Sequence, residues 1–480
     1  LALHAVPRRR AERGLADVPL PRPELNVLLE IPDGVRALLE RLWGHGHAAY
    51  VVGGSVRDAL LGRPAADWDL ATDARPDRIL ALFAGAVYEN RFGTVAVRDG
   101  AVTHQITTFR SDHDYADFRR PHRVEFGDDI RLDLARRDFT VNAMAWGADA
   151  PVTHAGDLPI PNPRLVDPHD GAADVAARTL RAVGDPATRF REDALRIVRA
   201  IRLATTLDFA IEPTTRQALA TEAGLVSHLS GERIAAELEK LLAAPNPSIG
   251  LRLLADTGVL TVVSPDLGAQ RGLAQNKIEG EDLLDHTLRT VDAAPAERPV
   301  VRLAALVHDI GKPATLDAGP FRGHETVGAE LAATFLDGLH FPRIVTERVV
   351  ELVRQHMFTY DPSWGDAGIR RFIQRVGAVN LDDLFALREA DNVGSGVDAT
   401  AHGLDELRAR VRDQLAAKAV LDLRHLAVDG DDLIAELGVP PGPTLGRILD
   451  ALLERVVGDP ALNDRATLLL IAESMLTEDD

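Results

Sequence analysis

The sequence predicts an α+β fold in which a small mixed α/β head precedes a long all-α body. Up to about residue 150, short apolar runs typical of strands alternate with helical segments. From about residue 172 onward, almost only helical periodicity is found. The link between the two parts is rich in proline, with Pro151, Pro159, Pro161, Pro163 and Pro168.

The composition is that of an ordinary globular protein. The 480 residues allow about two to four domains, and the hydrophobic (46%) and charged (26%) fractions are average. The lack of cysteine excludes a disulfide scaffold and thiolate metal sites. No apolar run approaches the roughly 20 residues that span a bilayer, and no secretory pattern follows Arg8 to Arg10. We therefore expect a cytoplasmic protein without a membrane partner.

The formal net charge of −19 argues mildly against a nucleic-acid partner, because phosphate binding requires local positive potential. Arginines nevertheless crowd two stretches, residues 119–137 and 178–202. A basic cleft in an acidic protein is therefore compatible with the sequence.

Residues 1–24 mix Arg, Pro and Ala without periodicity and are expected to form a disordered arm. Further on, Asp99-Gly100 is a strong hairpin signal between two apolar runs. In the head we expect helices at 33–45, 55–61 and 75–83, and strands at 48–52, 67–71, 94–97 and 102–109. In the body we expect helices at 194–204, 234–242, 301–307 and 445–456.

The stretch Gly53-Gly54-Ser55-Val56-Arg57-Asp58 lies between a predicted strand and a predicted helix. Glycines let a phosphate approach the backbone, and a helix N-terminus offers free N–H donors. Arg57 can add a charge-assisted contact. Taken alone, such a fragment is often only a turn.

Asp67 and Asp69 follow shortly, two residues apart on a predicted strand, and so face the same side. Two carboxylates on one face repel each other unless cations lie between them. Mg²⁺ prefers one or two carboxylates plus substrate phosphates, and a pair of ions can clamp both oxygens of a phosphoryl transfer. The alternative is a solvated edge strand that carries two charges.

Together, GGSVRD and DWDLAT resemble the signature of the DNA polymerase β nucleotidyltransferase superfamily. More narrowly, the chain resembles the class II group of bacterial CCA-adding enzymes and bacterial poly(A) polymerases, from about residue 30 to the C-terminus. The resemblance implies a polymerase-β-like head in which Asp67 and Asp69 are catalytic and bind Mg²⁺. It also implies nucleotide binding by Gly53, Gly54, Ser55 and Arg57.

A second motif, RRDFTVNA at residues 136–143, opens a predicted helix on which Asp138 and Asn142 share a face. Asp138 alone could equally be a helix cap. The string is similar to the second motif of the family. In that motif the matching Asp and Asn contact ribose, and the matching arginines, Arg137 among them, contact phosphate.

A third motif is Glu192-Asp193-Ala194-Leu195-Arg196, in which Asp193 and Arg196 are three apart on a predicted helix. Asp accepts and Arg donates hydrogen bonds, which suits cytosine and adenine and opposes uracil and guanine. An ordinary surface ion pair is the alternative. The matching family motif is an amino-acid template for CTP and ATP. Arg199 and Arg202 extend the basic stripe and could meet RNA phosphates or be solvated.

Between these motifs, Thr107-Thr108-Phe109-Arg110 precedes a polar segment from Ser111 to Val124. This segment resembles the family's flexible loop, which helps the switch from C to A addition and looks shortened in enzymes that add only C. Its full length favours complete CCA synthesis, and Arg110 is expected to bind nucleotide. Gln105 departs from the family pattern, because a carboxylate is expected there.

A second metal site is predicted in the body, where His308-Asp309 follows the apolar run Leu303 to Val307. Imidazole and carboxylate together suit borderline divalent transition metals, although a lone His-Asp pair is usually only a surface pair. The stretch resembles HD-domain phosphohydrolases. Their minimal ligand set maps onto His286, His308, Asp309 and Asp391, with His324 and His356 allowing a second metal. A hydrolase of cyclic or terminal phosphates and a degenerate scaffold both stay open.

The resemblance as a whole implies template-independent addition or repair of the CCA end of tRNA from CTP and ATP. Recognition of the tRNA would rest on backbone shape. One alternative is a poly(A) polymerase, which should prefer ATP. Another is an HD phosphohydrolase with a nucleotide-sensing head, which should have lost the head carboxylates. The expected domains are a nucleotidyltransferase head (25–162), a base-recognition neck (163–225), a helical body (226–275), an HD domain (276–400) and a helical tail (401–480).

Overall fold

The computed structural model describes residues 29–65, 67–90, 93–100, 102–115, 121–149, 162–275, 277–318, 321–417 and 422–478. The disordered arm predicted for residues 1–24 lies outside these residues. The chain divides into two compact units: the head, which ends at Ala177, and a helical unit, which begins at Arg178 and also takes in residues 114–122.

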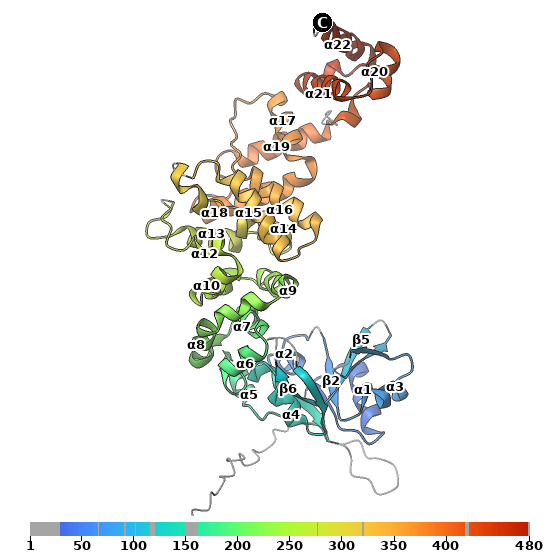
Figure 1. The fold of residues 1–480 in the computed structure, drawn as a ribbon, viewed down its shortest axis with the longest axis vertical. Helices are drawn as coiled ribbons and strands as arrows, with labels where there is room; N and C mark the ends of the chain where they lie inside the picture. The colour runs from blue at the N-terminus through green and yellow to red at the C-terminus, as the bar shows by residue number, and fades with distance from the viewer. Residues whose placement is uncertain are drawn as a thin grey trace, which may run out of the picture. The chain divides into compact units, whose positions relative to one another are not determined.

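The head is built on a seven-stranded sheet with the order β3-β4-β5-β2-β1-β8-β9 (Figure 1). Only β2 and β5 pair in parallel; the other neighbours are antiparallel. The strands are β1 (Ala49–Val52), β2 (Asp69–Thr72), β3 (Val87–Asn90), β4 (Thr94–Asp99), β5 (Val102–Thr108), β8 (Ala145–Ala148) and β9 (Arg164–Val166). The helices are α1 (Asp33–Trp43), α2 (Gly54–Leu60), α3 (Pro76–Leu82), α4 (Ile130–Ala135), η1 (Thr140–Asn142) and α5 (Gly171–Ala176).

Strand β1 lies near the centre of the sheet, between β2 and β8. All four of its residues are buried, which explains why its sequence is a continuous apolar run without alternation. Tyr50 packs against Phe109 and Leu134 in the core beneath the sheet. Gly147 of β8 is the register partner of Tyr50, and it lies so close to β1 that a Cβ there would be 2.2 Å from the Ala49 carbonyl oxygen. The turn at Gly53 and Gly54, which follows β1 directly, is therefore attached to a strand that is packed on both sides.

The predicted mixed α/β head is confirmed, and two details differ from the sequence-based expectation. The helix expected to open at Arg136 was wrong: Phe139 is extended, and only the single turn η1 follows before β8. Residues 139–148 are buried without interruption, so this run enters the sheet and does not form an amphipathic surface helix. The proline-rich link also contributes β9 to the sheet, so the head continues beyond residue 162.

Strands β6 (Arg110–Tyr115) and β7 (Pro121–Phe126) form a separate two-stranded sheet. They belong to the polar segment that resembles the flexible loop. The segment's tip, residues 116–120, lies outside the described residues.

From Arg178 onward, the described residues of the second unit are helical apart from the short strands β10 (Thr179–Leu180) and β11 (Ala210–Ile211). Its first helices are α6 (Pro186–Glu192), α7 (Leu195–Leu207), α8 (Pro213–Thr221), η2 (Ala223–His228), α9 (Gly231–Leu242), α10 (Pro247–Asp256), α11 (Val259–Val263) and α12 (Pro265–Gly268). The middle helices are α13 (Leu283–Ala293), α14 (Pro299–Val307), η3 (Pro313–Ala318), α15 (His324–Gly338), α16 (Arg343–Gln355), α17 (Asp366–Val376), η4 (Ala378–Asn380) and α18 (Leu381–Gly394). The last are α19 (Leu404–Ala416), η5 (Leu423–His425), α20 (Gly430–Leu437), α21 (Pro443–Gly458), η6 (Pro460–Leu462) and α22 (Arg465–Glu478).

Helix α14 is the interior helix of the middle group and packs against α13, α16 and α18 (Figure 1). Residues 301–307 are all buried, and all of them except Arg302 are apolar, so hydrophobic side chains cover most of the circumference of the helix. His308 and Asp309 follow directly at its C-terminal end. These two polar side chains therefore lie inside a hydrophobic bundle, where they need hydrogen-bonding or ionic partners.

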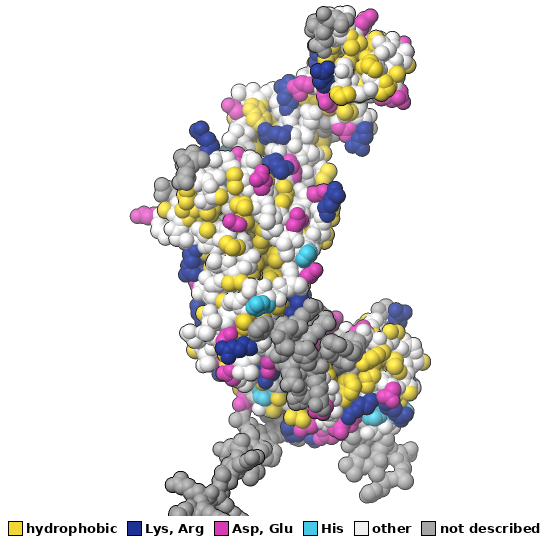
Figure 2. All heavy atoms as spheres, in the orientation of Figure 1, with side chains coloured by type: hydrophobic (Ala, Val, Ile, Leu, Met, Phe, Trp, Pro, Cys, Tyr) yellow, Lys and Arg dark blue, Asp and Glu magenta, His cyan; other side chains and the backbone are white. Residues whose placement is uncertain are grey.

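Helices α20, α21 and α22 have a hydrophobic core of their own, which includes Leu433, Leu452 and Leu468. On the visible face of the helical unit, Lys and Arg side chains are interspersed with Asp and Glu (Figure 2). Among the described residues, no helix combines the length and the apolar character needed to cross a bilayer.

Candidate active and metal sites

The glycine turn after β1 leaves no room for a side chain at Gly53. Gly53 has φ of 81° and ψ of −135°, in a region that favours glycine. A Cβ on Gly53 would lie 2.9 Å from Nη1 of Arg137, so a side chain would collide with that guanidinium. The Ser55 hydroxyl is buried and donates to the Val52 carbonyl, 3.2 Å away. The turn thus brings together Gly53, the start of α2 and Arg137.

Arg57 ties the first motif to the second. Its Nη1 donates to Oδ1 of Asn142 at 2.5 Å, and its Nε donates to Asp58 at 2.9 Å. Asn142 in turn donates from Nδ2 to Oδ1 of Asp138 at 3.1 Å. Arg57 is buried, and its guanidinium is already hydrogen-bonded to Asn142 and Asp58, so it lies on the interior side of the turn. Asp138 and Asn142 do lie together, although a loop and η1 position them where we expected a helix.

The carboxylate of Asp133 on α4 accepts hydrogen bonds from the arginines of this region. The sequence analysis did not identify this residue. Its carboxylate accepts from Arg136 at 2.7 Å, from Arg137 at 3.3 Å and from the Arg110 backbone N–H at 3.4 Å. Burial favours the neutral form of Asp133, but the charges of Arg136 and Arg137 outweigh it and lower the pKa. One buried carboxylate therefore positions three residues that sequence motifs associate with phosphate.

Asp67 and Asp69 are both exposed at the start of β2, next to β1 and the glycine turn. The strand begins at Asp69, so Asp67 belongs to the segment that leads into it. Ile106 is the register partner of Leu70, which places Gln105 beside Asp69 on the parallel neighbour β5. The Gln105 side-chain amide donates to Glu89 on β3 at 3.2 Å.

The third motif is arranged differently from the prediction. Asp193 and Arg196 do not share one helix, because α6 ends at Glu192 and Asp193 is extended, with φ of −146°. The Asp193 carboxylate accepts from the Leu195 N–H at 3.1 Å, the local bond by which Asp interrupts helices. Arg196 donates to Glu192 at 2.6 Å. Arg233 of α9 reaches both Asp193 oxygens, at 3.0 and 2.9 Å, and no sequence signal marked it.

Arg199 and Arg202 both face Glu237, a buried carboxylate on α9. Arg202 donates to it from Nε at 2.8 Å and is largely buried, whereas Arg199 lies 3.8 Å away and is 38% exposed. Arg199 is therefore the more accessible of the two for an RNA phosphate.

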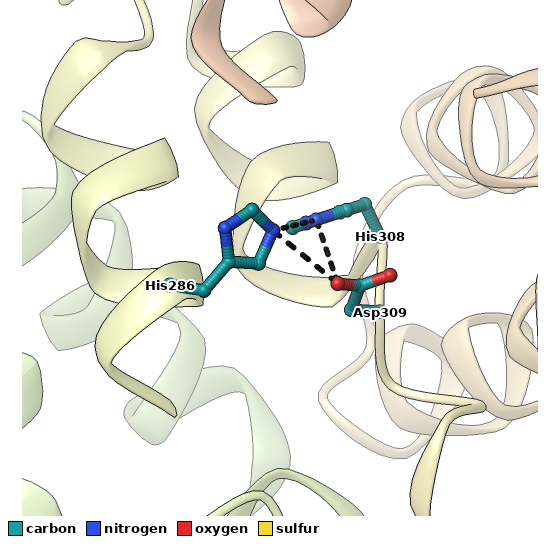
Figure 3. A group of neighbouring side chains, drawn as sticks. All are labelled: His286, His308 and Asp309. Atoms are coloured by element: carbon teal, nitrogen blue, oxygen red, sulfur yellow. Dashed lines mark hydrogen bonds and ion pairs between the residues drawn. The ribbon is translucent and has the colours of Figure 1, made fainter. Parts of the chain in front are cut away.

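The six residues predicted for the HD site come together in the helical unit. Figure 3 shows His286 of α13 pointing toward His308 and Asp309 at the end of α14. The Nε2 atoms of the two histidines are 3.1 Å apart, and they lie 3.3 and 3.2 Å from Oδ2 of Asp309. Asp391 of α18 adds an oxygen 3.2 Å from Nε2 of His286. Metal bonds of about 2.1 Å place neighbouring donors roughly 3 Å apart, so these spacings fit one ion.

A second group shares Asp309. Its other oxygen, Oδ1, lies 3.2 Å from Nε2 of His324 and 3.7 Å from Nε2 of His356. The two Nε2 atoms are 3.2 Å apart. Both groups have the composition and compactness of divalent metal sites.

The other ring nitrogens support metal binding. The Nδ1 atoms of His308, His324 and His356 each lie 2.6 to 2.8 Å from a backbone carbonyl oxygen three residues earlier. A carbonyl can only accept, so Nδ1 carries the proton and Nε2 keeps a lone pair, as in a metal ligand. Nδ1 of His286 is buried and has no hydrogen-bond partner among the described residues.

The charges around Asp309 keep its carboxylate ionised. Burial favours a neutral carboxyl, but His308 and Lys312 hold the pKa of Asp309 well below its usual value. Burial lowers the pKa of His308, which favours the neutral imidazole that binds metals. Two lysines that sequence reasoning did not assign lie against the cluster: Lys312 donates to Asp309 at 2.6 Å, and Lys277 to Asp391 at 3.3 Å.

Comparison with known proteins now adds to this geometry. Residues 49–181 match the family model of the poly A polymerase head domain, residues 208–270 match that of a probable RNA and SrmB-binding site of polymerase A, and residues 281–395 match the HD domain. The CCA-adding enzyme of Geobacillus sp. (strain WCH70) is 32% identical over 422 residues, which cover 88% of this chain and 91% of that one. The chain belongs to the CCA-adding enzyme family.

Other members of the CCA-adding enzyme family agree over nearly the whole length. The enzyme of Lactococcus lactis subsp. lactis (strain IL1403) is 33% identical over 453 residues, 92% of this chain and 97% of that one. A crystal structure of the Bacillus stearothermophilus CCA-adding enzyme in complex with CTP covers 94% of this chain and 100% of that one, with 28% identity and a TM-score of 0.66. The predicted family and fold class are confirmed.

Proposed function

We propose that this chain adds or repairs the 3′-terminal CCA of tRNA, using CTP and ATP without a nucleic-acid template. The observation that carries the proposal is the head geometry. Asp67 and Asp69 are exposed carboxylates, and Asp69 pairs with Val52, the residue before the glycine turn. Arg137 lies against the turn, and Asp138 and Asn142 are linked to it through Arg57.

In this proposal Asp67 and Asp69 are the catalytic residues and hold Mg²⁺, for which exposed carboxylates beside a phosphate-binding turn are suitable ligands. Mg²⁺ bound there supplies positive charge for the attacking 3′-hydroxyl and the departing pyrophosphate. The Gly53-Gly54 backbone, Ser55 at the start of α2 and Arg137 receive the triphosphate. Arg110, positioned through Asp133, contributes a further charge, and Asp138 and Asn142 orient the ribose.

Asp193 and Arg196 choose the base. An acceptor beside a donor matches the edge shared by cytosine and adenine, and it opposes the edges of uracil and guanine. Base selection therefore needs no nucleic-acid template. Arg199, and to a lesser degree Arg202, would contact the RNA backbone.

The test is to incubate the purified protein with tRNA that lacks its 3′ end, with Mg²⁺ and each nucleotide alone or in pairs. CTP alone should give two C additions, and ATP should then add one A. A long A tail from ATP alone would replace this proposal with a poly(A) polymerase. No incorporation at all would favour the alternative in which the head only senses nucleotides and the HD site carries the activity.

A second function is favoured by the cluster around Asp309. We propose that the HD site binds divalent transition metal ions through His286, His308, Asp309 and Asp391, with a second ion at His324 and His356. Ions held there suit the hydrolysis of 2′,3′-cyclic or terminal phosphates. A full chain that binds metal but hydrolyses neither substrate would leave the site as a structural metal centre.

A further inference from the structure

Lys277 lies at the edge of the HD cluster, and its side chain is partly accessible to solvent. Its side chain is 32% exposed, whereas that of Asp391 is 12% exposed and those of the other five ligand candidates are at most 4% exposed. Its Nζ lies 3.2 Å from Nε2 of His286 and 3.3 Å from Oδ1 of Asp391. A positive charge therefore marks the side from which the buried donors can be reached.

The distances place this ammonium group within the ring of donor atoms. Nζ lies 3.2 Å from His286 and 3.3 Å from Asp391, within the range of 3.1 to 3.9 Å that separates the donors from one another. It thus occupies a position that a further ligand of the same ion would take. An ammonium group has three donors and no lone pair, so it cannot itself bind a metal.

Asp391 already offsets part of the repulsion between an ion and Lys277, and a further anion at this corner would offset more of it. A phosphate oxygen can serve as this anion, because it can bind an ion and accept a hydrogen bond from an ammonium group. Lys312 cannot do the same, since its buried Nζ is held by Asp309 at 2.6 Å and by Gln275 at 3.1 Å.

We propose that Lys277 binds the phosphate of the HD substrate, a phosphomonoester or cyclic phosphodiester anion, by donating to an oxygen on the exposed side of the cluster. The proposal rests on the phosphohydrolase function proposed above. It adds a residue outside the predicted ligand set, from the segment that leads into α13.

The experiment compares the full chain with its Lys277→Ala and Lys277→Arg variants, and with Lys240→Ala as the matched control on the exposed face of α9. All four carry Asp67→Asn, which removes one of the two proposed ion ligands of the head and so weakens ion binding there. The proteins are loaded with Mn²⁺, their metal content is measured, and the affinity for inorganic phosphate is read from the broadening of its ³¹P resonance. This signal reports phosphate close to the ion and needs no turnover.

We expect Lys277→Ala to keep its Mn²⁺ and to weaken phosphate binding about tenfold or more, the loss of one charge-assisted hydrogen bond. Lys277→Arg should recover part of the affinity, and Lys240→Ala should match the parent. Tighter Mn²⁺ binding with unchanged phosphate affinity would overturn the proposal, since Lys277 would then only compete with the ion. A parent that holds Mn²⁺ but binds no phosphate would overturn it as well. Lys277-dependent phosphate binding without hydrolysis would retain Lys277 as a phosphate contact but reject the hydrolase, and with it the assignment of that phosphate to a substrate.

Discussion

Arg233 holds the Asp193 carboxylate from a helix that lies 40 residues further along the chain. A single nitrogen, Nη2, reaches both carboxylate oxygens, at 3.0 and 2.9 Å. Asp193 lies in the break between α6 and α7, where its backbone N–H donates to the Arg189 carbonyl at 3.4 Å and its carbonyl accepts from the Arg196 N–H at 3.0 Å. The orientation of the proposed base-reading acceptor thus depends on α9.

Arg233→Ala should therefore impair base selection more than nucleotide binding as such. We expect the efficiency of C addition to fall about tenfold or more, since a charge-assisted hydrogen bond contributes about 1.5 kcal/mol or more. Misincorporation of UTP should rise. The measurement is kcat/KM for CTP and UTP with tRNA that lacks its 3′ end. Arg216→Ala, an exposed arginine on α8, is the matched control. Equal losses for both nucleotides would show that Arg233 does not orient Asp193.

Asp67→Asn should abolish both the C and the A additions. Removing one of two carboxylates that hold the ions is expected to lower kcat by about a hundredfold or more, while the nucleotide still reaches the glycine turn. Single-turnover incorporation of CTP and ATP measures the effect. Asp77→Asn, an exposed carboxylate on α3, should leave both steps intact. Retained A addition in Asp67→Asn would contradict a shared catalytic site.

His308→Gln should remove metal from the HD site and leave CCA addition intact, because the proposed catalytic carboxylates belong to the other unit. Metal content is measured by mass spectrometry after dialysis, and CCA addition is assayed with excess Mg²⁺. His425→Ala, an exposed histidine on η5, should keep full metal content. If His308→Gln binds as much metal as the parent, the ligand assignment is wrong.

Asp133→Asn should destabilise the head by about 3 kcal/mol at neutral pH, because it leaves Arg136 and Arg137 next to a buried neutral group. The folded pKa of Asp133 is lowered, so its contribution is present above the unfolded value of about 3.9 and is lost as pH falls through the folded value. The gap between parent and variant should therefore shrink on acidification below about pH 4. Hydrogen exchange over residues 130–142 measures it locally.

The control for this prediction is Asp128→Asn, because Asp128 makes only an exposed ion pair with Arg75. It should change protection by less than about 1 kcal/mol at any pH. A gap between Asp133→Asn and the parent that grows on acidification would contradict a lowered folded-state pKa for Asp133.

The motifs predicted much of the candidate site, because the residues that carry its chemistry occur at fixed spacings in the sequence. Asp138 and Asn142, and all six HD ligand candidates, lie together in the structure as their motifs suggested. The seven helices expected from apolar periodicity all overlap helices of the structure, and the four expected strands overlap β1, β2, β4 and β5. Edge strands such as β3 and β9 escaped notice, because short, partly exposed segments carry little periodicity.

What the sequence could not supply were partners from distant elements. Arg233 and Lys277 lie in ordinary local sequence, and only tertiary packing brings them to Asp193 and Asp391. Asp133 is only four residues from Arg137, but nothing in the local sequence shows that its carboxylate is buried. The break between α6 and α7 was missed for a similar reason. A spacing of three residues suits one continuous helix, and nothing local in Asp193 excludes it.

Because Asp309 offers one oxygen to each metal group, the two groups cannot fill independently. An ion that draws Oδ2 toward His286 and His308 also fixes the direction of Oδ1 and reduces the negative charge available to the second ion. Each ion must then alter the affinity of the other by the same factor. Titration with a divalent metal should give a curve that two separate binding constants do not describe, and its departure from independence measures the coupling through one carboxylate.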